Sequence, residues 1–281
     1  MKTFLVIGNE TLAGAKLFET IRDKVDDAEG DARVVVCVPR NRPKHGNIIY
    51  DDFVFDAAKV RIDLARRFLR EHGIQAIGDI GDPDPYTAVM DAVAEHHPDE
   101  IIISTYPATV SGWLRRDLVE RVEDATGLPV THVVQDIDAE GLPFQVTVVV
   151  AAKTASGDEL LEHLKAKKAS DGERMFIVVV PQEGGEGQHA ARARARMAQL
   201  VDRLLAEGLL AAGMIGDPDP YTATMNALQF FRVDDIVIST LPATRSGWMR
   251  ADLIERVRKV SGKPVDHVEA SDRTASNAGA A

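Results

Sequence analysis

The segment Ile80-Gly81-Asp82-Pro83-Asp84-Pro85-Tyr86-Thr87-Ala88 recurs letter for letter, 135 positions later, as Ile215-Gly216-Asp217-Pro218-Asp219-Pro220-Tyr221-Thr222-Ala223. Outward from it, the same offset carries Ser104-Thr105-Tyr106-Pro107-Ala108-Thr109-Val110-Ser111-Gly112-Trp113 onto Ser239-Thr240-Leu241-Pro242-Ala243-Thr244-Arg245-Ser246-Gly247-Trp248. About 33 of the 54 positions from 80 to 133 are identical to their partners. A period this long is typical of a duplicated domain, because solenoid repeats have units of roughly 20–50 residues.

The amino-terminal part of each half is related more loosely. Leu5-Val6-Ile7-Gly8-Asn9 corresponds to Val148-Val149-Val150-Ala151-Ala152 at an offset of 143. We therefore predict two similar domains joined by a short linker. The expected bounds are a first domain at 1–135, a linker at 136–144, a second domain at 145–270 and a disordered tail at 271–281.

Within each half, short apolar runs alternate with segments of helical period. The runs are continuously apolar, as expected for parallel strands that are covered on both faces, and right-handed crossovers then give a doubly wound α/β domain. The predicted fold class is α/β, with two tandem five-stranded parallel sheets. The expected strands are 3–7, 33–38, 74–79, 100–104 and 130–134 in the first half, and 145–151, 175–180, 209–214, 235–239 and 265–268 in the second.

Composition narrows the class of protein. The chain has 281 residues, 45% of them hydrophobic, 27% charged and only one a cysteine, with a net charge of −11. The acidic charge argues against nucleic acid as a partner, and no apolar run approaches the roughly 20 residues that a membrane helix needs. Cys37 alone can form neither an intramolecular disulfide nor a Cys-rich zinc site. We expect a soluble, cytoplasmic protein with no nucleic-acid or membrane partner.

The loop after the fourth strand of each half is the main candidate site. It is rich in hydroxyl groups and leads into a helix predicted from Trp113, whose free N–H groups and dipole favour an anion such as phosphate. The alternative is that Ser111 and Ser246 only cap that helix. The candidate nucleotide- or anion-binding residues are Asn9, Ser104, Thr105, Thr109, Ser111, Gly112, Arg115, Ser239, Thr240, Thr244, Ser246, Gly247 and Arg250.

Other polar motifs are assigned to structure. Asp84 is expected to cap a helix that starts at Pro85, because proline suits the first helical position. Asp82 and Asp84 could instead hold a metal, but no third ligand follows in register. His132 and His267 are interpreted as packed or interface histidines. Neither a nucleophile beside a base nor a metal-binding motif is present, so no catalytic residue and no metal site is predicted.

Each half resembles the universal stress protein family. The resemblance rests on the order of five strands and four helices, on Gly-Asp-Pro before the third helix and on Pro-Val entering the last strand. ATP-binding members carry Gly-x(2)-Gly-x(9)-Gly-[Ser/Thr] after the fourth strand. The spacing survives here, but the glycine positions hold Ser104, Pro107 and Asp117 in the first half and Ser239, Pro242 and Asp252 in the second. The family's acidic residue after the first strand corresponds to Asn9 and, approximately, to Lys153.

This resemblance implies a non-enzymatic stress-type protein with two small-ligand or partner-binding modules. One alternative is an ATP- or AMP-binding member that uses the hydroxyl-rich loops, and another is a nucleotide hydrolase or transferase on the same scaffold. No cofactor is certain, and ATP or AMP are the candidates. The resemblance also implies that the two halves pair as an internal pseudo-dimer through 130–134 and 265–268, and a homodimer is the further candidate assembly.

Overall fold

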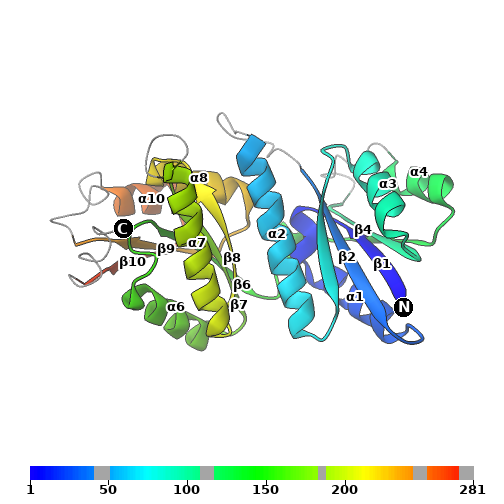
Figure 1. The fold of residues 1–281 in the computed structure, drawn as a ribbon, viewed down its shortest axis with the longest axis horizontal. Coiled ribbons are helices and arrows are strands. Elements are labelled where there is room, and N and C mark those ends of the chain that lie inside the picture. Colours follow the sequence, from blue (N-terminus) through cyan, green and yellow to red (C-terminus); the bar gives the residue numbers. More distant parts are fainter. Residues whose placement is uncertain (41–50, 108–116, 183–187, 243–251, 272–281) are drawn as a thin grey trace. The chain divides into compact units, whose positions relative to one another are not determined.

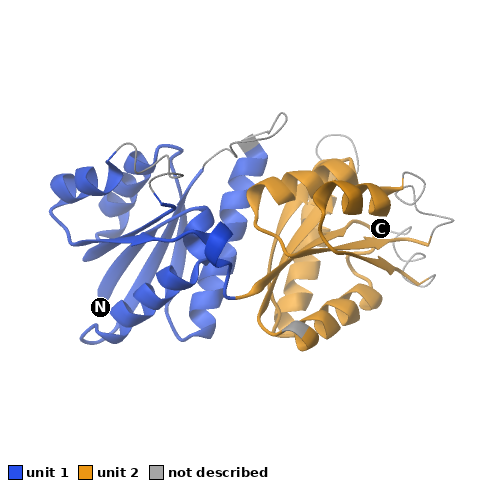
Figure 2. Ribbon diagram, turned by 180° about the vertical axis from the view of Figure 1, so that it is seen from behind, with its two compact units in different colours: residues 1–42, 50–143 blue, residues 43–49, 144–281 orange. Residues whose placement is uncertain are grey.

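The computed structural model describes residues 1–40, 51–107, 117–182, 188–242 and 252–271 (Figure 1). The chain divides into two compact units, one formed by residues 1–42 and 50–143 and the other containing everything from Phe144 onward (Figure 2). Each unit holds one five-stranded parallel sheet. Among the described helices, none combines the length and the apolar character that crossing a bilayer requires.

The first unit alternates strands and helices along the chain. Its elements are β1 (Lys2–Ile7), the 3₁₀ helix η1 (Glu10–Ala13), α1 (Ala15–Asp26), β2 (Ala32–Pro39), α2 (Asp51–Glu71), β3 (Ala76–Gly81), α3 (Pro85–His96), β4 (Glu100–Thr105), α4 (Leu118–Thr126), β5 (Val130–Val134) and α5 (Ile137–Glu140). All its neighbouring strands pair in parallel, in the order β3-β2-β1-β4-β5.

The second unit repeats this plan. Its elements are β6 (Gln145–Ala151), α6 (Asp158–Asp171), β7 (Arg174–Pro181), α7 (Gln188–Ala206), β8 (Leu210–Gly216), α8 (Pro220–Phe230), β9 (Asp235–Thr240), α10 (Leu253–Ser261) and β10 (Val265–Glu269). The strand order β10-β9-β6-β7-β8 is the first unit's order read from the other edge. The predicted α/β class with two five-stranded parallel sheets is therefore confirmed.

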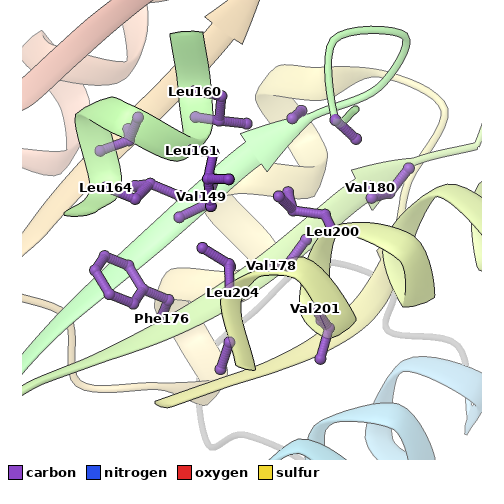
Figure 3. Packing of buried hydrophobic residues seen from close by; sticks show 14 of the residues in the cluster. Val149, Leu160, Leu161, Leu164, Phe176, Val178, Val180, Leu200, Val201 and Leu204 are labelled. Carbon is purple, nitrogen blue, oxygen red and sulfur yellow. The ribbon is translucent and has the colours of Figure 1, made fainter. Parts of the chain in front are cut away.

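Continuous apolar strands bury both faces of each sheet. In β1, Phe4 and Val6 face the helices α1 and α2, whereas Leu5 and Ile7 face α3 and α4. In the second unit, leucines of α6 and α7 pack onto apolar residues of β6 and β7 such as Val149 and Phe176 (Figure 3). A strand that is apolar at every position can only be covered on both faces, which is why this pattern predicted parallel sheets.

Two local expectations differ from the structure. The third strand was expected at 74–79, but β3 runs from 76 to 81 because it pairs as far as Pro39 opposite Gly81. The helix expected to run on from Trp113 begins, within the described residues, only at Leu118, because Asp117 has a left-handed backbone conformation that a continuous helix does not allow. Residues 113–116 and the expected tail from 272 onward lie outside the described residues.

The segment expected to link the domains contains α5 and packs against the first unit. Gln135 and Ile137 are buried there, and Lys16 of α1 pairs with Glu140 of α5 at 2.6 Å. The first unit therefore extends to Pro143.

The amino end of each fourth strand carries a buried carboxylate that pairs with a lysine from the first helix of the same unit. In the first unit Glu100 pairs with Lys24 and accepts a hydrogen bond from Thr131. In the second, Asp235 pairs with Lys167 at 3.4 Å and with the buried Arg174. These contacts lie at the end of the sheet opposite to the predicted site.

Candidate functional site

Ligands of open α/β sheets bind beyond the carboxyl ends of the strands, where the strand order reverses. In the first unit this switch point lies between β1 and β4, and in the second between β6 and β9. Five of the predicted site residues are described there: Asn9, Ser104, Thr105, Ser239 and Thr240. The other eight, Thr109, Ser111, Gly112, Arg115, Thr244, Ser246, Gly247 and Arg250, lie outside the described residues, as do Trp113 and Trp248.

The side chain of Gln135 lies at the switch point of the first unit and makes hydrogen bonds to polar groups there. It follows β5, is 1% exposed, and its Nε2 donates to Ser104 Oγ at 2.9 Å and to the carbonyl of Thr11 at 2.6 Å. Its Oε1 accepts from the backbone N–H of Leu17 in the first turn of α1, at 3.4 Å. That turn has no side-chain cap from Gly14, so Gln135 supplies a partner for one of its free N–H groups.

Gly14 makes room for this amide. A Cβ on Gly14 would lie 2.1 Å from Gln135 Oε1, so no larger residue fits without displacing the side chain. A glycine directly before α1 therefore leaves the space that the Gln135 amide occupies. Since the same helix N-terminus and the same Ser104 hydroxyl would serve an anion, the first unit satisfies these groups with its own side chain.

The second unit keeps this framework without the glutamine. Thr154 Oγ1 donates to the carbonyl of Ser239 at 3.1 Å, as Thr11 does to the carbonyl of Ser104. The backbone N–H of Ala270 donates to the carbonyl of Thr240, which is the bond that Gln135 makes to Thr105. Position 270 therefore corresponds to 135, but its methyl group cannot reach Ser239. Ser239 Oγ is buried and has no hydrogen-bond partner among the described residues.

The two switch points also differ in charge. In the first unit Tyr106 Oη donates to Glu10 Oε2 at 3.4 Å. Burial, with Glu10, Asp138 and Asp136 nearby, raises the pKa of Tyr106 well above its ordinary value. The guanidinium of Arg61 in α2 interacts with the charges of both Glu10 and Tyr106, so these acidic neighbours have a cation beside them.

At the corresponding positions of the second unit the sequence has no carboxylate. Lys153 replaces Glu10, Leu241 replaces Tyr106, and Ser271 replaces Asp136. Lys153 is exposed. A lysine in place of a glutamate makes this one position of the second unit more positive, by two units of charge, than its counterpart in the first unit.

Asn9 has a structural contact between the ends of two strands. It is 8% exposed, and its Nδ2 donates to the carbonyl of Pro39 at 3.1 Å, which fastens the end of β1 to the end of β2.

Each fourth strand ends on a threonine that contacts a histidine. Thr105 Oγ1 lies 2.9 Å from His132 Nε2, and Thr240 Oγ1 lies 2.8 Å from His267 Nε2. Burial lowers the pKa of His132. The two pairs fix the last residue before each candidate loop, so these histidines have a packing contact within their own unit.

Asp117 and Asp252 adopt a left-handed conformation at the start of α4 and α10. Their φ angles are 47° and 48°, and neither side chain caps the helix that follows. Non-glycine residues adopt this conformation at a cost of roughly 1–2 kcal/mol. Both units pay that cost at equivalent positions of the repeat, so the two halves share this backbone conformation.

The repeated Gly-Asp-Pro-Asp-Pro segment is structural, as predicted. Asp84 accepts from the backbone N–H of Thr87 at 3.0 Å and Asp219 accepts from that of Thr222 at 2.9 Å, with a proline at the first helical position in both. Cys37 is buried, and burial followed by the charges of Asp79 and Asp91 raises its pKa to about 12.

Sequence reasoning missed Gln135, Glu10 and Tyr106. The repeat drew attention to positions that the halves share, whereas these three residues differ between them. It also missed a cation–π contact present in both units, between Tyr86 and Arg121 at 4.0 Å and between Tyr221 and Arg256 at 4.2 Å. This contact packs the fourth helix of each unit against the third.

Solved universal stress proteins are among the structures to which this chain is similar. One from Archaeoglobus fulgidus is 18% identical, with a TM-score of 0.37, over 47% of this chain and 99% of the other. A universal stress protein from Archaeoglobus fulgidus DSM 4304 is 17% identical, with a TM-score of 0.36, over 96% and 97%. A protein of unknown function from Pseudomonas aeruginosa PAO1 is 14% identical, with a TM-score of 0.32, over 100% and 96%.

No family model and no curated protein matches this chain. The similarity to the solved structures therefore concerns the fold, and the roles of individual residues are argued from this chain alone.

Proposed function

We propose that this protein is a stress-type binding protein without catalytic activity, in which only the second unit accepts a ligand at its switch point. The observation that carries the proposal is the exchange of Gln135 for Ala270 at equivalent positions after the last strand. The ligand class is a small anion, with a phosphate group as the form that the loop after β9 would bind.

The first unit is disfavoured on two physical grounds. Gln135 already occupies the hydroxyl of Ser104 and a free N–H of α1, so a ligand would have to break these buried hydrogen bonds. Breaking a buried hydrogen bond and leaving its partners unsatisfied costs about 1–3 kcal/mol. Glu10 would in addition repel a phosphate, an effect that the charge of Arg61 offsets in part.

The second unit offers the complementary features. Lys153 follows β6 directly, and the loop after β9 carries Arg245 and Arg250 where the first unit has Val110 and Arg115. The first turn of α6 contains Asp158 and Glu159. Arg203 binds Asp158 at 2.6 Å and offsets its charge, and Glu159 accepts from the backbone N–H of Ser271 at 3.3 Å. The candidate residues of this module are Ser239, Thr240, Thr244, Ser246, Gly247 and Arg250.

Calorimetric titration with ATP, AMP and inorganic phosphate tests the proposal. We expect Lys153→Glu to weaken binding at least about tenfold, since it replaces an attractive charge with a repulsive one. The matched control is Glu10→Gln in the first unit, which should leave affinity unchanged. Equal loss in both variants, or affinity unchanged by Lys153→Glu, would contradict the assignment. Release of phosphate from ATP would replace it with an enzymatic function.

A second candidate function is nucleotide binding by the loops of both units. It is favoured by one observation. Asp117 and Asp252 stand where the ATP-binding motif of the resembled family has its last glycine, and both have a positive φ, which glycine adopts readily. The prolines at 107 and 242 lack an N–H group and restrict these loops, and the two aspartates add negative charge. We therefore expect any nucleotide affinity to be weaker than micromolar.

A further inference from the structure

Three metal-ligating side chains gather on the first unit, away from the switch point. Asp79 lies on β3, and Glu95 and His96 are the last two residues of α3. One ligand atom from each lies within 4.8 Å of the other two, and His96 Nε2 is 3.1 Å from Asp79 Oδ2. We propose that this triad binds a divalent transition-metal ion of the zinc type.

The fold holds two of the three donors in place. Asp79 of β3 lies opposite Cys37 of β2 in the parallel sheet. Its side chain is therefore on the face covered by α3, which is also the face of the buried Cys37 thiol. The end of α3 is fixed by a hydrogen bond from Arg33 Nη2 to the carbonyl of His96 at 3.4 Å. His97 then ends the helix in a left-handed conformation.

The distance between the two held donors suits a shared ion. Zinc binds histidine nitrogen and carboxylate oxygen at roughly 2.0–2.2 Å, so two donors on one tetrahedral ion lie about 3.3–3.6 Å apart. The observed 3.1 Å needs only a small opening. Glu95 is exposed and can turn its carboxylate inward as the third donor. The side chains of His96 and Asp79 are 14% and 36% exposed, so an ion can enter from solvent.

The donor set also matches the ion in charge. Two carboxylates and a neutral imidazole balance the charge of a divalent cation, and imidazole with carboxylate oxygen favours zinc and similar metals over calcium or magnesium. Three protein donors leave a coordination position for water.

The second unit is an internal control, because it builds the same β-α corner without the donors. Met214, Phe230 and Phe231 occupy the corresponding positions, and the rings of the two phenylalanines lie 6.4 Å apart. Met214 and Phe230 are almost fully buried. The fold therefore needs no charged residue at any of the three positions, yet the first unit has a metal-ligating side chain at all three.

Metal titration of the full chain tests this proposal and does not depend on the proposed anion ligand. Chelator-treated protein is titrated with Zn²⁺ by calorimetry and with Co²⁺ by visible absorption, which reports coordination directly. We expect one site per chain, weakened at least about tenfold by Glu95→Gln and by His96→Gln. Glu95 is exposed, so its variant should fold normally, and thermal melts check both.

Two matched controls locate the ion. His97→Gln alters the neighbouring histidine, and His163→Gln alters the histidine of the second unit that pairs with Asp266 at 3.2 Å. Both should bind metal as the wild type does. A titration without a site, or a site that survives both Glu95→Gln and His96→Gln, would overturn the proposal and leave Asp79 and His96 as an ion pair.

Discussion

Gln135 Nε2 donates to Ser104 Oγ at 2.9 Å, whereas the equivalent Ala270 leaves Ser239 Oγ without a partner among the described residues. Two sites that share a backbone framework thus differ by one amide group. A buried hydroxyl without a partner has lost its hydration without compensation, whereas the hydroxyl of Ser104 is satisfied.

Removing each hydroxyl should therefore have opposite consequences. We expect Ser104→Ala to destabilise its unit by about 1–2 kcal/mol, because it leaves an amide of Gln135 partly unsatisfied. Ser239→Ala should be neutral or stabilising, because it removes an unsatisfied polar atom. Urea unfolding, followed by hydrogen exchange to assign each transition to a unit, measures both. Equal costs for the two changes would show that the hydroxyls are in equivalent environments.

The left-handed aspartates give a second stability prediction. Asp117→Gly and Asp252→Gly should each stabilise the protein by about 0.5–1 kcal/mol, since glycine adopts positive φ without the clash of a Cβ atom. The matched control is Asp124→Gly inside α4, which should cost about 0.3 kcal/mol, because glycine is slightly worse than aspartate inside a helix. Thermal melts compare the three. Destabilisation by Asp117→Gly comparable to that of Asp124→Gly would mean that the aspartate makes a contact worth more than the strain.

Glu100 predicts how stability depends on pH. Burial alone would raise the pKa of Glu100, but hydrogen bonds from Lys24, Thr131 and Lys2 outweigh it and hold this pKa below the ordinary value of 4.5. A carboxylate with a lowered pKa stabilises the fold above its unfolded pKa, and this contribution is lost as the pH falls through the folded value.

We therefore expect Glu100→Gln to destabilise the first unit at pH 7 by about 1–3 kcal/mol, since it leaves the half-buried Lys24 without its charged partner. The difference from the wild type should shrink as the pH falls below 4.5. Denaturant unfolding of both proteins from pH 7 to pH 3 measures this difference in the free energy of unfolding. A difference that stays constant across this range would show that the carboxylate charge contributes nothing.

Substitutions in the loops after β4 and β9 distinguish helix capping from anion binding. If Ser246 only caps a helix, Ser246→Ala should cost about 0.5–2 kcal/mol and Arg250→Ala much less. If both residues hold an anion, as proposed for the second unit, both variants should lose the rise in melting temperature that phosphate causes. The matched pair Ser111→Ala and Arg115→Ala should show no phosphate-dependent effect. A phosphate effect lost equally in both units would contradict the assignment to one.

The fold was predictable because it depends on features that a single sequence displays. The 135-residue repeat indicated two domains, and continuously apolar runs such as Val148–Val150 indicated buried parallel strands, which the sheets confirm. The predicted ends of helices and strands were less accurate where the backbone conformation of a single residue determines them. The letter code of Asp117 gives no sign of a left-handed backbone, so the interruption directly before Leu118 was not predicted.

The candidate site was predictable in position but not in its contacts. The carboxyl ends of β4 and β9 follow from the topology, so Ser104 and Ser239 were found. Gln135 lies 31 residues from Ser104 in the sequence, and only the tertiary fold brings its amide to that hydroxyl. Asp79 and His96 are likewise 17 residues apart and meet through the packing of α3 on β3. The pairing of the two halves and the homodimer stay predictions.

The stoichiometry of anion binding tests the central claim most directly. Calorimetric titration of the full chain with ATP, and with inorganic phosphate in a parallel series, counts sites independently of any mutation. We predict one site per chain, of affinity weaker than micromolar for ATP, which disappears in Lys153→Glu and persists in Glu10→Gln. Two equivalent sites per chain, or one site that survives Lys153→Glu, would contradict the proposal. The proposal is that Gln135 blocks the switch point of the first unit, whereas Ala270 leaves that of the second unit accessible to an anion.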